Sequence, residues 1–167
     1  MYQAAVAVHI ISAVVWLGGM LFLVMVMLPT ARAAMQEGSP EAGLGVLREA
    51  ADRFLPVAWT AMVLLGLSGG YLAWEHGGIR PGMFFSDSGR FTQILQIKSG
   101  LFIAVVLLSL IHDFWLGPKV LEKLDAARAA GEVLPQSLAR KVVRMTAGVN
   151  LLAAMSILVL AVWLIRP

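Results

Sequence analysis

Four long apolar segments constrain the fold of this chain more than any other feature. A helix needs about 20 mostly apolar residues to cross the hydrocarbon core of a bilayer. The sequence therefore predicts an all-α integral membrane protein, a four-helix transmembrane bundle. The predicted spans cover residues 4–28, 54–74, 91–116 and 145–165.

The composition agrees with a chain that faces lipid rather than water. Hydrophobic residues make up 59% of the 167 residues and charged residues only 14%, against about 25% charged in a typical soluble domain. We expect a single transmembrane domain over residues 1–167. Its net charge of +3 does not indicate nucleic acid, because the basic residues form no patch interleaved with aromatic residues. The absence of cysteine excludes disulfides and thiolate metal sites.

The connections between spans predict short interfacial helices in two loops. Ser39, Pro40 and Glu41 give the start signal of a helix, a capping serine before a proline, so we expect a short surface helix to about residue 52. The pair Gly117-Pro118 is expected to end the third span, with another interfacial helix before Arg144. We find no convincing internal repeat.

The distribution of lysine and arginine predicts the orientation. The loop between spans 1 and 2 and the loop between spans 3 and 4 hold nine basic residues with their flanks, against three on the other side. The positive-inside rule then places both basic loops in the cytoplasm and both termini outside. We expect a multi-pass protein of a bacterial-type inner (plasma) membrane, with membrane lipid as its surroundings.

Three ionisable residues inside the spans are functional candidates, because such residues are costly in a bilayer. His9 and Lys98 each lie roughly 10 Å outward of the middle of their spans, counted on the helical rise. His112 lies about 20 Å from that level by the same measure. We therefore expect His9 and Lys98 to share a depth, and His112 to be at most a separate second site.

The helical face of His9 is suited to a cofactor. Ser12, Trp16 and Met20 follow His9 on one side of the helix. The glycines 18 and 19 beside this face allow a flat ligand or a neighbouring helix to approach closely. One interpretation is that His9 is the axial ligand of a haem near the outer face, since imidazole ligates haem iron. The alternative is a neutral His9 that is hydrogen-bonded to a neighbouring helix.

Several residues are candidates for the rest of such a site. Lys98 has three interpretations: its stem snorkels to the interface, its ammonium contacts a propionate or a substrate carboxylate, or its amine ligates the metal. His76 is either a second axial ligand or an exposed loop residue. Arg80 and Arg90, on the outer side, are expected to pair with haem propionates.

The inner end of span 3 carries a second polar group. His112 and Asp113 are expected to form an ionic cluster with Arg140 and Arg144 that holds spans 3 and 4 together, with a second ligand site as the less favoured interpretation. Asn150 is predicted to make an interhelical hydrogen bond.

Copper is the alternative to haem. Met20 and Met27 share the face of His9, and thioether ligands suit Cu(I). Methionines in a membrane chain are more often packing residues. The sequence has no nucleophile–base pair, paired carboxylates or zinc spacing, which argues against a hydrolase.

Three segments together resemble two related groups of membrane proteins. These segments are His-Ile-Ile-Ser-Ala-Val-Val-Trp-Leu-Gly-Gly-Met-Leu-Phe at residues 9–22, Ile-Lys-Ser-Gly-Leu at 97–101 and Ile-His-Asp-Phe-Trp at 111–115. They are similar to the membrane domain of copper resistance protein D (CopD) and to the HemJ-type protoporphyrinogen IX oxidases, which bind haem b. The resemblance implies that His9 is a haem-ligating histidine and that Lys98 is functional. The methionine-rich run at residues 23–29 is more like CopD.

The resemblance implies a haem b-binding membrane redox protein. Its reaction would be electron transfer with an unknown electron donor or acceptor, extending to oxidation of a tetrapyrrole if the chain is a haem-dependent oxidoreductase. The alternatives are a copper-transport or copper-tolerance protein without haem, and a structural subunit of a larger complex. A homodimer is one expected partner, since small membrane bundles often dimerise.

Overall fold

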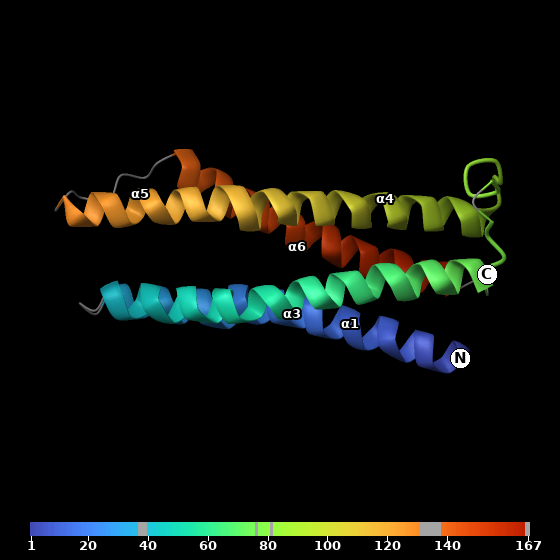
Figure 1. Cartoon of the computed structure of the whole chain (residues 1–167), viewed down its shortest axis with the longest axis horizontal. Coiled ribbons are helices and arrows are strands. Elements are labelled where there is room, and N and C mark those ends of the chain that lie inside the picture. The colour runs from blue at the N-terminus through green and yellow to red at the C-terminus, as the bar shows by residue number, and fades with distance from the viewer. Residues whose placement is uncertain (37–39, 76, 81, 131–137, 166–167) are drawn as a thin grey trace. The chain divides into compact units, whose positions relative to one another are not determined.

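The chain is a set of long helices joined by short connections (Figure 1). The computed structural model describes residues 1–36, 40–75, 77–80, 82–130 and 138–165, and within these ranges it contains helices and turns but no strand. The all-α prediction is therefore confirmed. In chain order the elements are α1 (Tyr2–Phe22), η1 (Leu23–Met27), α2 (Leu28–Gln36), α3 (Pro40–Glu75), α4 (Arg90–Ile111), η2 (His112–Leu116), α5 (Gly117–Ala129) and α6 (Leu138–Ile165). The segments η1 and η2 are single turns of π-helix, called π-turns below.

Four of the helical stretches in the described ranges are long and apolar enough to cross a membrane. They cover Tyr2–Ala34, Gly45–Glu75, Arg90–Val120 and Arg144–Leu164, and they match the four predicted spans. Large apolar side chains on their outer surfaces are exposed, among them Val14, Leu67 and Leu152. Such surfaces are stable against lipid and not against water, so the protein is a multi-pass membrane protein whose helices contact lipid.

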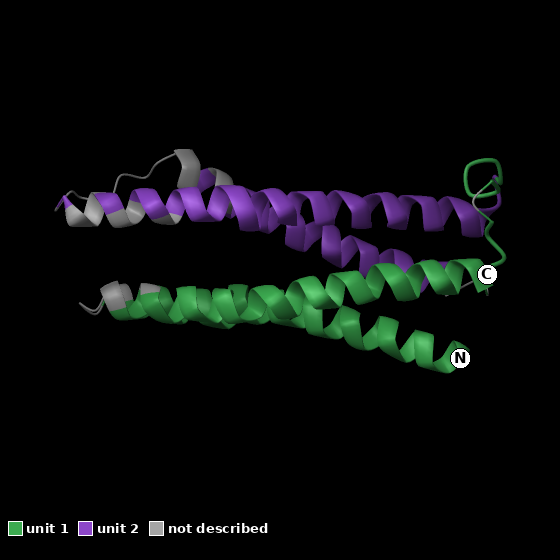
Figure 2. Cartoon of the chain, in the orientation of Figure 1, with its two compact units in different colours: residues 1–87 green, residues 88–167 purple. Residues whose placement is uncertain are grey.

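The chain divides into two compact units, residues 1–87 and residues 88–167 (Figure 2). In the first unit, α1, η1 and α2 run along α3. In the second unit, α4, η2 and α5 run along α6. Each unit is thus a helical hairpin with its own polar and apolar contacts. The single domain over residues 1–167 stays a prediction.

Each unit contains a π-turn followed by a proline. The Leu28 N–H donates to the Leu23 carbonyl in η1, and the Gly117 N–H donates to the His112 carbonyl in η2, in both cases five residues back. Pro29 and Pro118 come next in the sequence. A proline ring clashes with the carbonyl four residues back in a regular helix, and a preceding wide turn gives that ring room.

The wide turns correct one prediction about where helices end. Gly117-Pro118 was expected to terminate the third span, but the helix continues through η2 into α5 and ends at Ala129. Because the π-turn accommodates the proline, no break is needed.

The helix predicted after residue 39 also differs from the expectation. Residues 40–52 are helical, as predicted, but they form the first turns of α3 and are not a separate surface element. The capping residue Ser39 lies outside the described residues. A 36-residue helix is about 54 Å long, so α3 is longer than the roughly 30 Å of the hydrocarbon core.

The two units share a register that their sequences do not reveal. His9 precedes the first residue of η1 by 14 positions (9 to 23), and Lys98 precedes the first residue of η2 by 14 positions (98 to 112). Trp16 and Val105, each seven positions further along, are both buried. The order of elements is also the same: a helix, a π-turn, a proline, a second helical stretch and a returning helix. His9 and Lys98 therefore occupy equivalent positions in their own units.

Candidate functional site

The predicted face of α1 is the face that packs on α3. Ser12 and Trp16 are each only 4% exposed, which confirms the helical face drawn from their spacing. Gly19 continues the same face and allows a close approach, since a Cβ built there would clash with the ring of Phe54. An aromatic ring on α3 thus occupies the space that a larger residue would need. His9 lies on this face, one turn before Ser12.

His9 is half-buried and contacts Ser68 on α3. The distance between His9 Nδ1 and Ser68 Oγ is 2.9 Å. The Ser68 hydroxyl donates to the backbone carbonyl of Leu64 at 2.5 Å. Because a serine hydroxyl has one proton, Ser68 Oγ accepts in its contact with His9 and Nδ1–H of His9 donates. A neutral imidazole that makes this contact carries its proton on Nδ1 and its lone pair on Nε2.

A glycine beside Ser68 makes room for this imidazole. A Cβ built at Gly69 would lie 3.1 Å from Cε1 of His9 and 3.6 Å from its Nδ1. At the next position, Gly70, a Cβ would meet nothing within 4 Å. Of these two glycines, only Gly69 lies against the ring, and its lack of a side chain lets the imidazole approach α3. Ser68 and Gly69 were not predicted as site residues. The sequence shows there only a hydroxyl side chain and a pair of glycines within an uncharged span.

The contact with Ser68 agrees with both interpretations of His9. A hydrogen bond to a neighbouring helix is what the structural interpretation requires. It is also what a ligand requires, because metal-ligating histidines almost always donate their other ring N–H to a nearby acceptor. Neutral imidazole is the form that iron or copper binds.

The other predicted site residues are placed as follows. Lys98 lies half-buried on α4 in the second unit, and Arg90 is exposed at the first residue of that helix. In the first unit, the Arg80 guanidinium stacks over the ring of Trp74 at 4.8 Å. His76 lies outside the described residues. The structure describes the two units separately, so the pairing of His9 with Lys98 stays a prediction.

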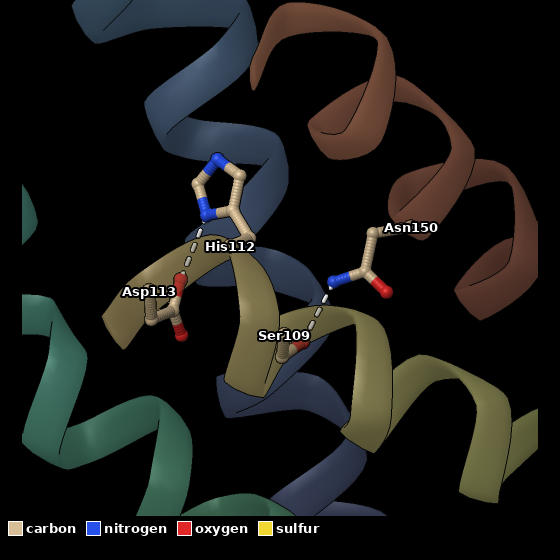
Figure 3. A network of polar contacts seen from close by, with 4 residues as sticks. All are labelled: Ser109, His112, Asp113 and Asn150. Atoms are coloured by element: carbon tan, nitrogen blue, oxygen red, sulfur yellow. Dashed lines mark hydrogen bonds and ion pairs between the residues drawn. The ribbon is translucent and has the colours of Figure 1, made fainter. Parts of the chain in front are cut away.

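A second polar group lies where α4 meets η2. Nδ1 of His112 is 2.8 Å from Oδ1 of Asp113, and Nδ2 of Asn150 on α6 donates to Oγ of Ser109 at 2.8 Å (Figure 3). The predicted interhelical hydrogen bond of Asn150 is thus confirmed. Oδ1 of Asn150 is buried without a hydrogen-bond partner among the described residues.

The ionic cluster predicted at this end is found in part. The pair of His112 and Asp113 is present, whereas the side chain of Arg140 lies outside the described ones and Arg144 is exposed. Among the described contacts, the bond between Ser109 and Asn150 joins α4 to α6.

The donor groups decide which kinds of metal site the described residues allow. Across the described ranges, no three side chains of His, Asp or Glu come together as they do in a closed metal site. A tetrahedral zinc-type centre is therefore not formed by these residues. A single axial position of a haem requires one imidazole, and among the described residues His9 is a half-buried histidine within a span.

The fold and these residues define a class: an all-α, four-span membrane protein with ionisable side chains inside its spans. The chain matches the family described as copper resistance protein D over residues 48–164, and it belongs to that family. It is also 33% identical over 117 residues, 68% of each chain, to an uncharacterized protein of Aquifex aeolicus (strain VF5). No solved structure matches it.

The family assignment confirms the CopD part of the resemblance. The matched range includes Ser68, Lys98 and His112, and it begins after His9 and Trp16. The resemblance of residues 9–22 to the first span of HemJ-type proteins, and with it the HemJ-type activity, stays a prediction.

Proposed function

We propose that this protein is a haem b-binding membrane redox protein in which His9 is an axial ligand. The observation that carries the proposal is the contact between Nδ1 of His9 and Ser68. Because Ser68 accepts from Nδ1–H, the lone pair of the imidazole is on Nε2. A ligand histidine is oriented in this way by its second hydrogen bond, which also raises its basicity.

The surroundings of His9 support this role. The imidazole is half-buried between α1 and the Ser68–Gly69 step of α3, so its ring is fixed by packing as well as by a hydrogen bond. Haem supplies one-electron redox chemistry when it is bound. The protein would hold the imidazole, exclude water with the apolar side chains of the spans, and set the local charge. These are the properties by which a protein tunes a haem potential.

Lys98, Arg80 and Arg90 are proposed as the cationic partners of haem propionates. All three are basic side chains, and the sequence predicts that they lie toward the outer ends of the spans. Cation–carboxylate contacts of this kind are strong and directional. We propose the propionate contact for Lys98 in preference to direct ligation of the iron. The electron donor or acceptor belongs to this proposal as an unidentified partner.

A second candidate function is favoured by the family. Its description refers to copper resistance, and copper would then be the substrate of a tolerance or transport protein without haem. Met20, half-buried on the face of His9, would join the imidazole as a soft ligand.

The absorption spectrum of the detergent-purified protein separates these functions. The haem proposal predicts a Soret band that shifts on reduction with dithionite. His9→Ala should abolish the band, and Ser68→Ala should weaken haem affinity by roughly 10- to 100-fold, as loss of an outer hydrogen bond to a ligand does. His112→Ala is the matched control and should keep the band.

Three results would count against haem ligation by His9. A Soret band that survives His9→Ala removes that residue as the ligand. A colourless protein that contains copper supports the second function. A colourless protein without metal supports a structural role in a larger complex.

A further inference from the structure

The two segments that connect the spans at residues 28–53 and 117–144 carry net charges of opposite sign. Residues 28–53 contain three basic and four acidic side chains, a net charge of −1. Residues 117–144 contain six basic and three acidic side chains, a net charge of +3, which equals the net charge of the whole protein. The positive charge of this protein is thus concentrated at one end of the second unit.

The arrangement of side chains increases this contrast. In the first unit, Arg53 forms an ion pair with Glu49 at 2.6 Å, so part of its charge is neutralised. In the second unit, Lys123, Lys141 and Arg144 are exposed, and none of them has an ion pair with another described residue. These exposed groups lie at the surface, where an external anion can reach them.

Lys119 is held at this end by an aromatic ring. Its Nζ lies 4.9 Å from the ring centroid of Trp115, which is 68% exposed. Tryptophan is enriched at the boundary between lipid and water, and a cation over its face is attracted to the ring. The pair therefore combines an interfacial type of aromatic residue with a positioned ammonium. Lys123 follows one turn further along α5, and the exposed Glu122 is next to it in the sequence.

The returning helix brings two further cations to the same end. α5 and α6 are in contact, and Lys141 and Arg144 lie in the first turns of α6. We define the basic end as Trp115, Lys119, Lys123, Lys141 and Arg144. It combines four exposed cations with one interfacial aromatic residue.

We propose that the basic end is a binding site for the phosphate headgroup of an anionic phospholipid. Clusters of Lys and Arg at the membrane boundary attract anionic lipids, by about 1 kcal/mol for each basic residue. Trp115 would lie against the upper acyl chain while Lys119 and Lys123 contact the phosphate. This inference does not depend on whether the protein binds haem, because it uses other residues.

The test measures lipids bound to the purified full-length protein by native mass spectrometry. Protein in detergent is titrated with phosphatidylglycerol, with phosphatidylcholine and with inorganic phosphate. We expect retention of phosphatidylglycerol in preference to phosphatidylcholine. The double variant Lys119→Gln and Lys123→Gln should weaken it by roughly 10- to 30-fold, the equivalent of about 1 kcal/mol per lysine.

Two controls separate charge from folding. The double variant Lys119→Arg and Lys123→Arg keeps the charge and should keep the preference. Arg48→Gln, an exposed cation of the first unit, should leave it unchanged. Equal retention of the two lipids, or an unaltered preference in the Lys→Gln variant, would overturn the proposal. Competition by inorganic phosphate at equal concentration would show a free-anion site and overturn the lipid assignment.

Discussion

The packing of His9 against α3 can be tested with two adjacent glycines. Gly69→Ala introduces a Cβ at 3.1 Å from Cε1 of His9, whereas Gly70→Ala introduces one that meets nothing within 4 Å. Both changes replace glycine by alanine in the same helix, with the same gain in helix propensity. A difference between the two variants therefore reports the contact with His9.

The size of the difference follows from the distances. Non-bonded carbons are comfortable at about 3.5–4.0 Å, so the imidazole must move by about 0.5 Å to accept the new methyl group. The hydrogen bond to Ser68, now 2.9 Å, would lengthen beyond the usual upper limit of about 3.2 Å. Loss of such a bond costs about 1 kcal/mol. We expect Gly69→Ala to be less stable than Gly70→Ala by about that amount.

The assay is unfolding of both variants in mixed detergent and dodecyl sulfate micelles, followed by circular dichroism. Nitrogen NMR of labelled histidine reports the tautomer of His9 in the same samples. The reasoning predicts a lower midpoint for Gly69→Ala and loss of the pure Nδ1–H form. Equal midpoints together with an unchanged histidine spectrum would show that the imidazole does not rest on Gly69.

Two further predictions concern the second unit. Gly117→Ala places a Cβ 3.1 Å from the backbone oxygen of His112, which cannot move aside easily. We expect the free energy of unfolding to fall by about 1–2 kcal/mol relative to Gly100→Ala, where nothing lies within 4 Å of the new Cβ. Equal unfolding midpoints of the two variants would contradict this. Asn150→Leu removes an interhelical bond to Ser109 worth about 0.6 kcal/mol in a membrane and also the buried Oδ1 without a described partner, whose burial costs about 1–3 kcal/mol. That variant should be at least as stable as the parent in the same assay, and a loss above about 1 kcal/mol would refute the account.

Hydropathy was sufficient to predict the spans because the bilayer sets a length that any crossing helix must meet. The same reasoning failed at Gly117-Pro118. This pair is a common helix terminator in sequence, but the π-turn before it absorbs the proline and the helix continues. A wide turn depends on one shifted hydrogen bond, which residue types alone do not specify.

The site was predictable on one helix and not on its neighbour. The spacing of His9, Ser12 and Trp16 gave the buried face of α1, because helical periodicity is local. Ser68 was missed because its hydroxyl donates a hydrogen bond to the Leu64 carbonyl of its own helix. A serine in an apolar span therefore does not require a hydrogen-bond partner on α1. That partner is a matter of tertiary packing.

The shared register of the two units was hidden for a different reason. Its equivalent positions hold unlike residues: Lys98 stands where the first unit has His9, and Val105 where it has Trp16. Similarity of sequence is therefore absent at the positions where the two hairpins correspond most closely. Only the backbone landmark, a wide turn with a proline after it, reveals the correspondence.

The π-turns also change the direction in which side chains point on either side of them. One additional residue in a turn advances the chain by about 100° around the axis. A stripe traced from His9 along α1 therefore does not continue in phase beyond Met27, and the same break in phase separates Lys98 from Lys119. In each unit, the side chains before the π-turn can therefore face one direction and those of the helix after it another. The two directions can change independently.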